Sequence, residues 1–274
     1  MENIHKTKER AVCIFRTLLV SEGKLMPKIE TITLRCLNPE AMRRFYIDIL
    51  GMDQREDGAV SYGPAQAGII FEKAEYPYRH SAGDVYWKIA LAVPNIELAY
   101  EQLTTQGLAV GVPHQFRDIG YLAHFQDPEG FTIELIEHWF QGNRPSINHD
   151  PSRLGGGASL NLLTLRTHEI NPIRDACLTW GMRPLSVQSV ESHGFTLHFF
   201  AFTEDTPPSA DLTAVKNREW LYQRPYTVLE IQEVHGSAPM TGIPVKTAGY
   251  SATRVTGVDV MIDCEALRIT GQRA

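Results

Sequence analysis

The clearest alternation of hydrophobic and polar residues follows the tight-turn sequence DPEG at 127–130. Asp, Pro and Gly supply the backbone angles that a reversal needs, and residues 131–136 then alternate with the period of a strand. Ile133 and Leu135 share one face of this predicted strand, whereas Glu134 lies on the opposite face. A carboxylate among apolar neighbours is costly to bury unless it is paired or bound to a metal. Glu134 is therefore either a site residue or an edge residue that reaches solvent.

Similar patterns recur along the chain and indicate repeated structural modules. The segments 34–52 and 165–182 both open with Leu-Arg and close with Gly-Met. The Asn-Pro pairs at 38–39 and 171–172 are typical helix starts, and the closing glycines are typical helix ends. Each module is thus predicted to contain a strand, then a helix, then further strands.

Two more copies of the module follow from the same signals. The predicted elements are strands near 52–56, 59–63 and 67–74 in the first copy, and a strand at 86–93, a helix at 95–107 and strands near 109–112, 119–126 and 131–138 in the second. A weaker fourth copy begins at Gly249, with a strand at 253–257 and a helix from 258 to near the last residue, so that its last three strands are missing. Strands and helices in this order favour an α+β fold with antiparallel-rich sheets.

Composition places the chain among ordinary globular proteins, because 43% of its residues are hydrophobic and 21% are charged. A net charge of −6 argues against nucleic acid or an anionic membrane as the main partner. The four cysteines are widely spaced and form no C-x-x-C pair. With no visible signal peptide, they predict reduced thiols in a cytoplasmic protein. The apolar run 11–20 is too short to span a membrane.

Polar segments divide the chain into predicted domains. Residues 1–25 are expected to be an N-terminal extension, with Met26 as an alternative start. The segment 142–158, rich in Gly, Asn, Pro and Ser, is predicted to be a linker between a first domain at 26–141 and a second at 159–274.

The order and spacing of several motifs resemble the vicinal oxygen chelate superfamily, which includes glyoxalase I, bleomycin-resistance proteins and extradiol dioxygenases. The motifs are FYIDILGM (45–52), IALAVPNIELAYEQL (89–103), HFQDPEGFTIELI (124–136), FTLHFFAFTED (195–205) and YTVLEIQEVHG (226–236). The resemblance implies tandem βαβββ modules in two cup-shaped halves, of which the second is divergent and incomplete. It also implies that metal ligands project into each cup from the first and last strands of the modules.

In the first cup, the resemblance places Thr31, Glu72, Lys88 and Glu134 at the ligand positions. Two carboxylates are kept, but the two positions that hold His or Gln in the family are not. A protonated lysine cannot coordinate a metal, and its charge opposes a dication. Three interpretations stay open: an ordinary buried ion pair, a metal-free binding or catalytic cluster, and a metal site formed by Glu72 and Glu134. No cofactor is required by the sequence, and a divalent ion (Zn, Ni, Mn or Fe) is the alternative.

The second half is a weaker candidate. Leu162, Glu230 and Ala252 occupy its ligand positions, so Glu230 is a lone carboxylate that is expected to be solvated or hydrogen-bonded. The two His and the Glu that extradiol dioxygenases hold in this half are absent. Ring cleavage is therefore the least favoured function.

The predicted function is that of a glyoxalase-like protein that binds a small oxygenated metabolite in the first cup. Glu134, Glu72 and Lys88 are the candidate catalytic residues, with a carboxylate as general base. The residues expected to line the cup and bind the ligand are Thr31, Tyr62, Tyr86, Arg117, Tyr121 and His124, with His80 as a further choice. The alternative is a metal-dependent lyase or isomerase of the glyoxalase I type. The expected partners are a small-molecule ligand and a second copy of the chain, in a homodimer.

Overall fold

The computed structural model describes residues 26–274 except 237–239, 241–243, 259–262, 265–266 and 273–274. The first two modules comprise β1 (Lys28–Cys36), α1 (Pro39–Arg44), β2 (Asp53–Gln54), β3 (Val60–Ser61), β4 (Gly68–Lys73), β5 (Tyr86–Val93), α2 (Ile96–Thr105), β6 (His114–Phe116), β7 (Gly120–Gln126) and β8 (Thr132–Glu137). The last two comprise β9 (Ser159–Thr167), α3 (Ile170–Thr179), β10 (Arg183–Val190), β11 (Phe195–Ala201), α4 (Lys216–Tyr222), β12 (Val228–Val234), β13 (Gly249–Thr256), β14 (Asp263–Cys264) and β15 (Ile269–Gln272).

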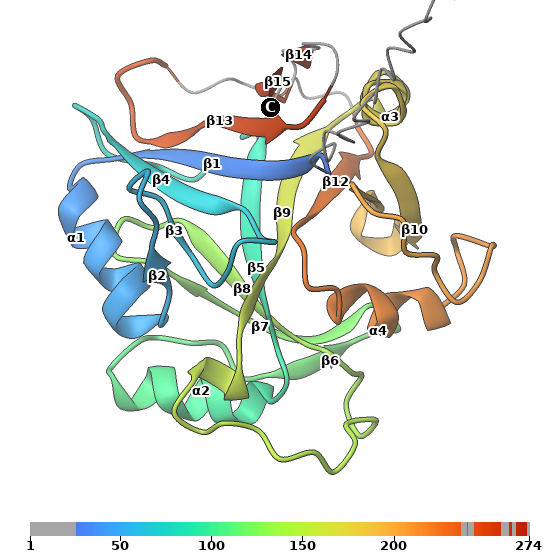
Figure 1. The fold of residues 1–274 in the computed structure, drawn as a ribbon, viewed down its shortest axis with the longest axis horizontal. Helices are drawn as coiled ribbons and strands as arrows, with labels where there is room; N and C mark the ends of the chain where they lie inside the picture. The colour runs from blue at the N-terminus through green and yellow to red at the C-terminus, as the bar shows by residue number, and fades with distance from the viewer. Residues whose placement is uncertain (1–25, 237–239, 241–243, 259–262, 265–266, 273–274) are drawn as a thin grey trace, which may run out of the picture.

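The modules pair across the two halves of the chain. β5 and β9 pair antiparallel, which joins the second and third modules in a sheet of order β10-β11-β12-β9-β5-β8-β7-β6. β1 and β13 pair in the same way, which joins the first and fourth modules in a sheet of order β14-β15-β13-β1-β4-β3-β2. Figure 1 shows both central pairs side by side. The α+β fold of tandem modules is confirmed, but the expected cup made from modules one and two is wrong.

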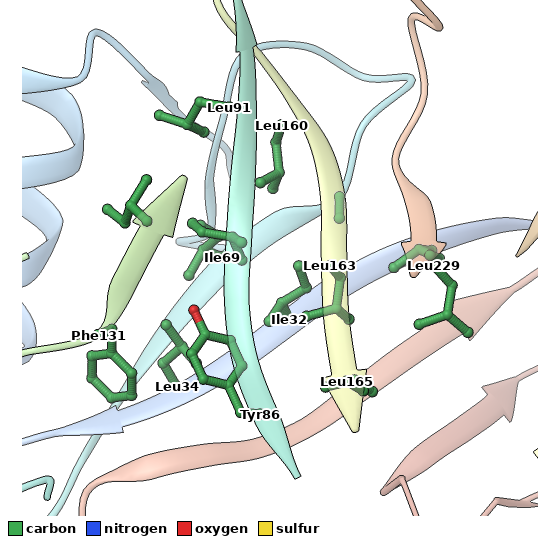
Figure 2. Packing of buried hydrophobic residues seen from close by; sticks show 14 of the residues in the cluster. Ile32, Leu34, Ile69, Tyr86, Leu91, Phe131, Leu160, Leu163, Leu165 and Leu229 are labelled. Atoms are coloured by element: carbon green, nitrogen blue, oxygen red, sulfur yellow. The ribbon is translucent and has the colours of Figure 1, made fainter. Parts of the chain in front are cut away.

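A single hydrophobic core holds the two sheets together. Ile32 and Leu34 of β1 belong to the same buried cluster as Ile89 of β5, Leu163 of β9 and Ile231 of β12. Figure 2 shows side chains of both sheets facing this shared layer. Burying a large aliphatic side chain contributes about 1.5–3 kcal/mol. Because both halves of the chain supply strands to each sheet, the predicted boundary at 142–158 is not a boundary between sheets, and the domain limits stay a prediction.

Each central strand carries a one-residue irregularity at the same place in its module. The pairing of β5 with β9 skips Trp87 and Asn161, and that of β1 with β13 skips Glu30 and Ser251. Such β-bulges re-aim the side chains that follow them. The shared bulge aligns the modules residue by residue, so that Lys88 is equivalent to Leu162 in the third module.

The local sequence pattern predicted most helices and strands, but it misplaced the bounds of several. The helix-capping asparagines were correct at Asn38 and Asn95, whose side chains accept from Ala41 N and Leu98 N. The cap of α3 is Glu169, two residues before the predicted Asn-Pro pair. The strand predicted near 109–112 lies at 114–116, and α4 was not predicted.

The fourth module also differs from its prediction. The helix expected from 258 onward lies partly outside the described residues, but β14 and β15 follow β13 where that helix and no strands were expected. Among the described residues, no helix combines the length and the apolar character that a membrane span requires.

The DPEG turn is held by a buried carboxylate. Asp127 Oδ1 accepts from the backbone N–H groups of Glu129 and Phe131, and Oδ2 accepts from the Tyr46 hydroxyl. Burial raises the pKa of Asp127 to about 7 and outweighs these hydrogen bonds, which lower it. The DPEG turn therefore depends on the carboxyl group of Asp127, whose pKa is near neutrality.

We predict that Asp127→Asn flattens the pH dependence of stability. Since the pKa of Asp127 rises from 3.8 to about 7 on folding, its contribution is fully present below 3.8 and is lost as pH rises through 7. The free energy of unfolding of the wild type, relative to the variant, should fall by roughly 3–4 kcal/mol between pH 4 and 8. Urea unfolding of both proteins across that range measures the difference, and a constant difference would show that Asp127 does not titrate on folding.

Candidate functional site

A cavity of about 250 Å³ opens on the face of the β5–β9 sheet that points away from the shared core. Its lining residues are Trp87, Lys88, His114, Phe116, Ile119, Leu122, His124, Glu134, Ile136, Leu162, Phe195, Leu197, Tyr222, Glu230 and Gln232. They come from the second and third modules, so the site lies across the predicted domain boundary. The walls are mainly apolar and aromatic, as small-molecule pockets usually are.

The charged side chains of the cavity converge on Lys88. Its Nζ donates to Glu134 Oε1 at 2.8 Å and to Glu230 Oε2 at 3.1 Å. The three residues are only 5%, 4% and 2% exposed, respectively. Thr164 completes the cluster by donating its hydroxyl to Glu230 Oε2. A buried ammonium thus compensates two buried carboxylates.

His124 extends the cluster toward the opening of the cavity. It lies on β7 beside β8, where it is the register partner of Glu134. Its Nε2 is 3.0 Å from Glu134 Oε2, and its side chain is 39% exposed. Each oxygen of Glu134 therefore has its own partner. Because β8 lies between β5 and β7, the choice left open by the sequence is settled: Glu134 is not on an edge strand.

Electrostatics keep Lys88 and Glu134 ionised. Burial by itself lowers the pKa of Lys88, but Glu134 and Glu230 outweigh it and raise the pKa above its usual range. Burial likewise raises the pKa of Glu134, but Lys88 and His124 outweigh it and hold the pKa well below its usual range. Opposite charges at hydrogen-bond distance favour both charged forms. Glu134 is consequently a poor general base.

The pairing register shows why these residues meet. Glu134 on β8 is the register partner of Ala90 on β5, and Glu230 on β12 is the partner of Thr164 on β9. Lys88 lies two residues before Ala90, as Leu162 lies two residues before Thr164. The two modules therefore contribute equivalent pairs, Lys88 with Glu134 and Leu162 with Glu230.

The bulge and α4 shape the walls. Because of the bulge at Trp87, the consecutive residues Trp87 and Lys88 both line the cavity. Arg166 stacks on the Trp87 ring at 4.3 Å from its centroid. From α4, Tyr222 packs into the cup and donates its hydroxyl to Ile119 O at 3.0 Å.

The structure brings together only some of the predicted site residues. Lys88, Glu134 and His124 line the cavity as expected. Glu72 and Thr31 do not join them, because both lie in the other sheet, where Thr31 is buried and Glu72 is exposed. The predicted convergence of the four side chains, and with it a metal pair of Glu72 and Glu134, is wrong.

The remaining predicted ligand-binding residues lie elsewhere. Tyr86 is buried in the shared core, and Tyr121 donates to Glu97 Oε1 on α2. Tyr62 donates to Leu50 O beside a separate cleft, and Arg117 adopts a positive φ of 50° in the turn between β6 and β7. His80 lies near the site, with its ring 5.3 Å from that of Trp87.

The contact of Glu230 with Lys88 was not predicted. Glu230 was placed at the right module position and was expected to be solvated or hydrogen-bonded in the half that was the weaker candidate; it is hydrogen-bonded, by Lys88 and Thr164. The aromatic and aliphatic walls from β11 and α4 were missed as well. The available signal was the alternation of VLEIQ at 228–232, which repeats that of TIELI at 132–136.

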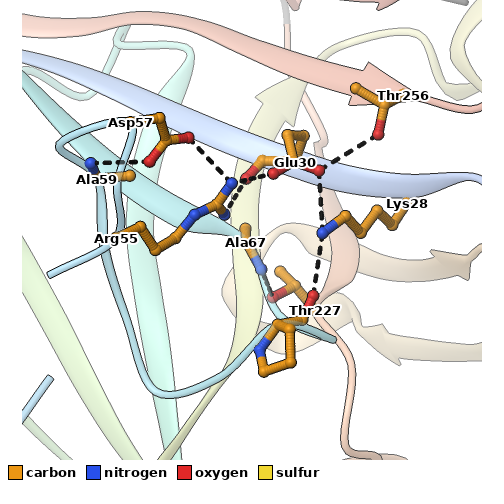
Figure 3. A network of polar contacts seen from close by, with 9 residues as sticks. Lys28, Glu30, Arg55, Asp57, Ala59, Ala67, Thr227 and Thr256 are labelled. Atoms are coloured by element: carbon orange, nitrogen blue, oxygen red, sulfur yellow. Dashed lines mark hydrogen bonds and ion pairs between the residues drawn. The ribbon is translucent and has the colours of Figure 1, made fainter. Parts of the chain in front are cut away.

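In the other sheet, Thr31 and Ala252 occupy the positions that correspond to Lys88 and Leu162. The register of β1 with β4 pairs Thr33 with Ile70, so that Ile70, and not Glu72, is the equivalent of Glu134. The bulge residue Glu30 is engaged by Arg55, by Lys28 at 3.0 Å and by Thr256 at 3.3 Å (Figure 3). Glu30 is only 9% exposed, and Lys28 and Arg55 of this network line a separate pocket.

The residues of the cavity do not fit a divalent metal. The place between Glu134 and Glu230 is taken by the Lys88 ammonium, which has no lone pair to donate. Leu162, at the equivalent position of the third module, also offers no donor atom. Among the described residues, no group of three or more His, Cys, Asp or Glu is arranged to hold a metal ion. Catalytic metal sites usually need three protein ligands and an open position.

The order of strands and helices in the modules defines a tandem α+β fold. Residues 28–135 match the model of the Glyoxalase/Bleomycin resistance protein/Dioxygenase superfamily, which confirms the resemblance over this part of the chain. No curated protein sequence matches the chain.

Solved structures of glyoxalase I from Zea mays share the fold. One is 15% identical with a TM-score of 0.57 and covers 84% of this chain and 74% of the maize chain. A first point variant is 15% identical with a TM-score of 0.59 and covers 84% of this chain and 76% of the maize chain. A second is 17% identical with a TM-score of 0.58 and covers 84% of this chain and 74% of the maize chain. At these identities the likeness establishes the fold alone.

Proposed function

We propose that the cavity on the face of the β5–β9 sheet binds a small, largely apolar molecule through an oxygen atom, without a metal. The observation that carries this proposal is the position of Lys88, whose Nζ contacts both carboxylates at the floor of the cavity. An ammonium has three N–H donors. Glu134 and Glu230 accept from two of them, which leaves the third for an acceptor on the ligand.

The walls favour an apolar body for this ligand. Phe116, Phe195 and Leu197 line the cavity together with Leu122 and Ile136. Removing their surface from water contributes about 25 cal/mol per Å² of apolar area. A volume of about 250 Å³ accommodates a molecule of one or two rings.

The charge balance favours a neutral ligand. Two carboxylates face one ammonium within the cluster, so an anionic ligand would be repelled and would lose its hydration. A carbonyl, ether or hydroxyl oxygen accepts a charge-assisted hydrogen bond from Lys88 at no such cost. This bond is worth about 1.5–3 kcal/mol.

The test uses 6-propionyl-2-(dimethylamino)naphthalene, a neutral aromatic ketone whose fluorescence shifts to the blue in apolar surroundings. We expect saturable binding by the wild type. The analogue with a propyl group in place of the propionyl group should bind roughly 10–100-fold more weakly, since it lacks the acceptor.

Two substitutions of leucine locate the bound probe. Leu197 is 7% exposed and lines the cavity, so Leu197→Trp should fill it and abolish binding. Leu178 lies on α3 and is 47% exposed, so Leu178→Trp is the matched control and should bind like the wild type. Equal binding by both variants, or equal affinity for the ketone and its propyl analogue, would contradict the proposal.

The homodimer and the cytoplasmic location remain predictions. Both walls of the cavity come from one chain, so a second copy is not needed to complete it. Light scattering of the purified protein measures the oligomeric state.

A further inference from the structure

A second cavity, also of about 250 Å³, lies between the first two modules. Its walls come from the end of the first helix, from α2 and from the connection between β8 and β9. It shares no described lining residue with the cavity at Lys88. Its lining is mixed, with charged and amide side chains beside apolar ones, so it suits a different kind of molecule.

The first helix ends at this cavity in a π-helical turn, η1 (Phe45–Ile49), which continues α1. Single π-helical turns are rare and occur frequently at functional sites. The Tyr62 hydroxyl donates to Leu50 O at 2.6 Å, but within the described residues the carbonyl oxygens of Asp48 and Ile49 accept no hydrogen bond. Carbonyls at the end of a helix carry the negative end of its dipole and favour a cation.

Arg153 brings a positive charge to the same cavity from the connection between β8 and β9. Its backbone is fixed to α2, because Gln102 Nε2 donates to Pro151 O at 2.9 Å and to Arg153 O at 3.1 Å. Gln102 Oε1 in turn accepts from Gly155 N at 2.8 Å. Burial raises the pKa of Tyr62, and the charge of Arg153 acts in the opposite direction, which places the guanidinium near the Tyr62 hydroxyl.

Asp48 and Arg153 carry opposite charges but do not contact each other. Both line the cavity, and neither forms an ion pair with any other side chain in the part of the chain that the structure describes. Asp150, whose pKa is lowered by Ser152 and also by Arg153, accepts its hydrogen bonds from Ser152. A molecule that carries one charge of each sign would satisfy both Asp48 and Arg153.

We propose that this cavity binds a free α-amino acid, with its ammonium group at Asp48 and the end of η1 and its carboxylate at Arg153. An ammonium has three donors, which suit one carboxylate and two backbone carbonyls. A guanidinium holds a carboxylate through two parallel hydrogen bonds. The site is independent of the proposed function, because it uses none of the residues at Lys88.

The size and the apolar part of the lining favour an aliphatic amino acid. The cavity has about eight times the volume that one water molecule occupies in the liquid. This volume suits leucine, which has nine non-hydrogen atoms. Its side chain would pack against Leu154 and Ala158, which also line the cavity and are almost fully buried.

Calorimetric titration of the wild type with L-leucine tests the site. We expect saturable binding of one molecule per chain. L-Leucinamide lacks the carboxylate and 4-methylpentanoate lacks the ammonium group, so each should bind roughly 10–100-fold more weakly than leucine. A wild type that does not bind leucine, or that binds 4-methylpentanoate equally well, would overturn the proposal.

Two substitutions of exposed residues test the orientation of the bound amino acid. Arg153→Gln should weaken leucine binding roughly 10–100-fold and leave the weaker binding of leucinamide unchanged. Asp48→Asn should weaken leucine binding to a similar extent and leave that of 4-methylpentanoate unchanged. Arg79→Gln and Asp175→Asn are the matched controls, because both residues are exposed and lie outside the cavity lining. Leucine binding that survives both Arg153→Gln and Asp48→Asn would overturn the proposal.

Competition with the naphthyl ketone separates this site from the cavity at Lys88. Saturating leucine should leave the affinity for the ketone unchanged, because the two cavities share no described lining residue. Competitive displacement of the ketone by leucine would place the amino acid at Lys88 and overturn the second site. Absence of ketone binding, with leucine bound as expected, would contradict the proposed function alone and support this site.

Discussion

Replacing Lys88 with methionine is expected to lower the free energy of unfolding by about 3–5 kcal/mol at pH 7. Methionine keeps an unbranched apolar side chain one atom shorter than that of lysine, but it removes the charge between Glu134 and Glu230, which are 4% and 2% exposed. Two carboxylates would then be buried together without a cation. Urea unfolding in the presence of a chelator, followed by tryptophan fluorescence, measures the loss.

Neutralising the carboxylates is the matched control. The triple variant Lys88→Met/Glu134→Gln/Glu230→Gln should regain most of the lost stability, because replacing a whole buried ionic group is often close to neutral. If Lys88→Met were as stable as the wild type, or if the triple variant were no more stable than Lys88→Met, the three charges would not be coupled.

The destabilisation caused by Lys88→Met should depend on pH. In the wild type the pKa of Glu134 is lowered from 4.5 on folding, so its contribution is fully present above 4.5 and is lost as pH falls below it. Without Lys88, the buried carboxylates are relieved when they take up protons. The difference in the free energy of unfolding between the wild type and Lys88→Met should therefore become smaller as the pH falls from 7 to 4.

The double variant Lys88→His/Leu162→His is expected to gain a divalent-metal site. Lys88 and Leu162 are equivalent positions on β5 and β9, and each lies beside the closing strand that carries Glu134 or Glu230. Two imidazoles and two carboxylates around the present position of the ammonium form a donor set that suits Zn²⁺ or Ni²⁺. Affinity should rise roughly 10³-fold or more over the wild type, as expected for three or four new metal–ligand bonds.

Single changes test whether all four positions act together. Either His variant alone should bind the ion more weakly than the pair, and adding Glu134→Ala to the pair should abolish stoichiometric binding. Calorimetric titration with Ni²⁺ measures each affinity. Tight binding that survives Glu134→Ala would place the ion elsewhere and contradict the assignment of these positions.

Local pattern predicted the modules well because it depends on neighbours in sequence. The alternation around Glu134 assigned its face correctly, with Ile133 and Leu135 in the shared core and Ile136 in the cavity. The helix capped by Asn95 was also placed correctly. These features are fixed by strand and helix periodicity and by side-chain capping.

The hydrophobic and polar pattern could not predict which modules share a sheet. The same pattern fits a second module that pairs with the first and one that pairs with the third. The choice depends on contacts between strands far apart in sequence, such as Lys88 on β5 with Glu230 on β12. We expected neighbouring modules to pair, and Glu230 was consequently placed apart from the residues that it contacts.

The assignment of Glu72 failed for a related reason. A register slip of one residue moves a side chain to the other face of a sheet, but a slip of two residues keeps it on the same face. Glu72 lies two residues beyond Ile70, the true equivalent of Glu134, so its alternation looked correct. Only the pairing register with β1 distinguishes the two.

The central claim is that the Lys88 ammonium occupies the place between Glu134 and Glu230 and makes the cavity a metal-free site. Its most direct test is calorimetric titration of the wild type, stripped with a chelator, with Zn²⁺, Ni²⁺, Mn²⁺ and Fe²⁺, followed by metal analysis after dialysis. The account predicts no stoichiometric binding and an unchanged melting temperature in the presence of each ion. Binding of one ion per chain that is lost in Glu134→Ala would contradict it.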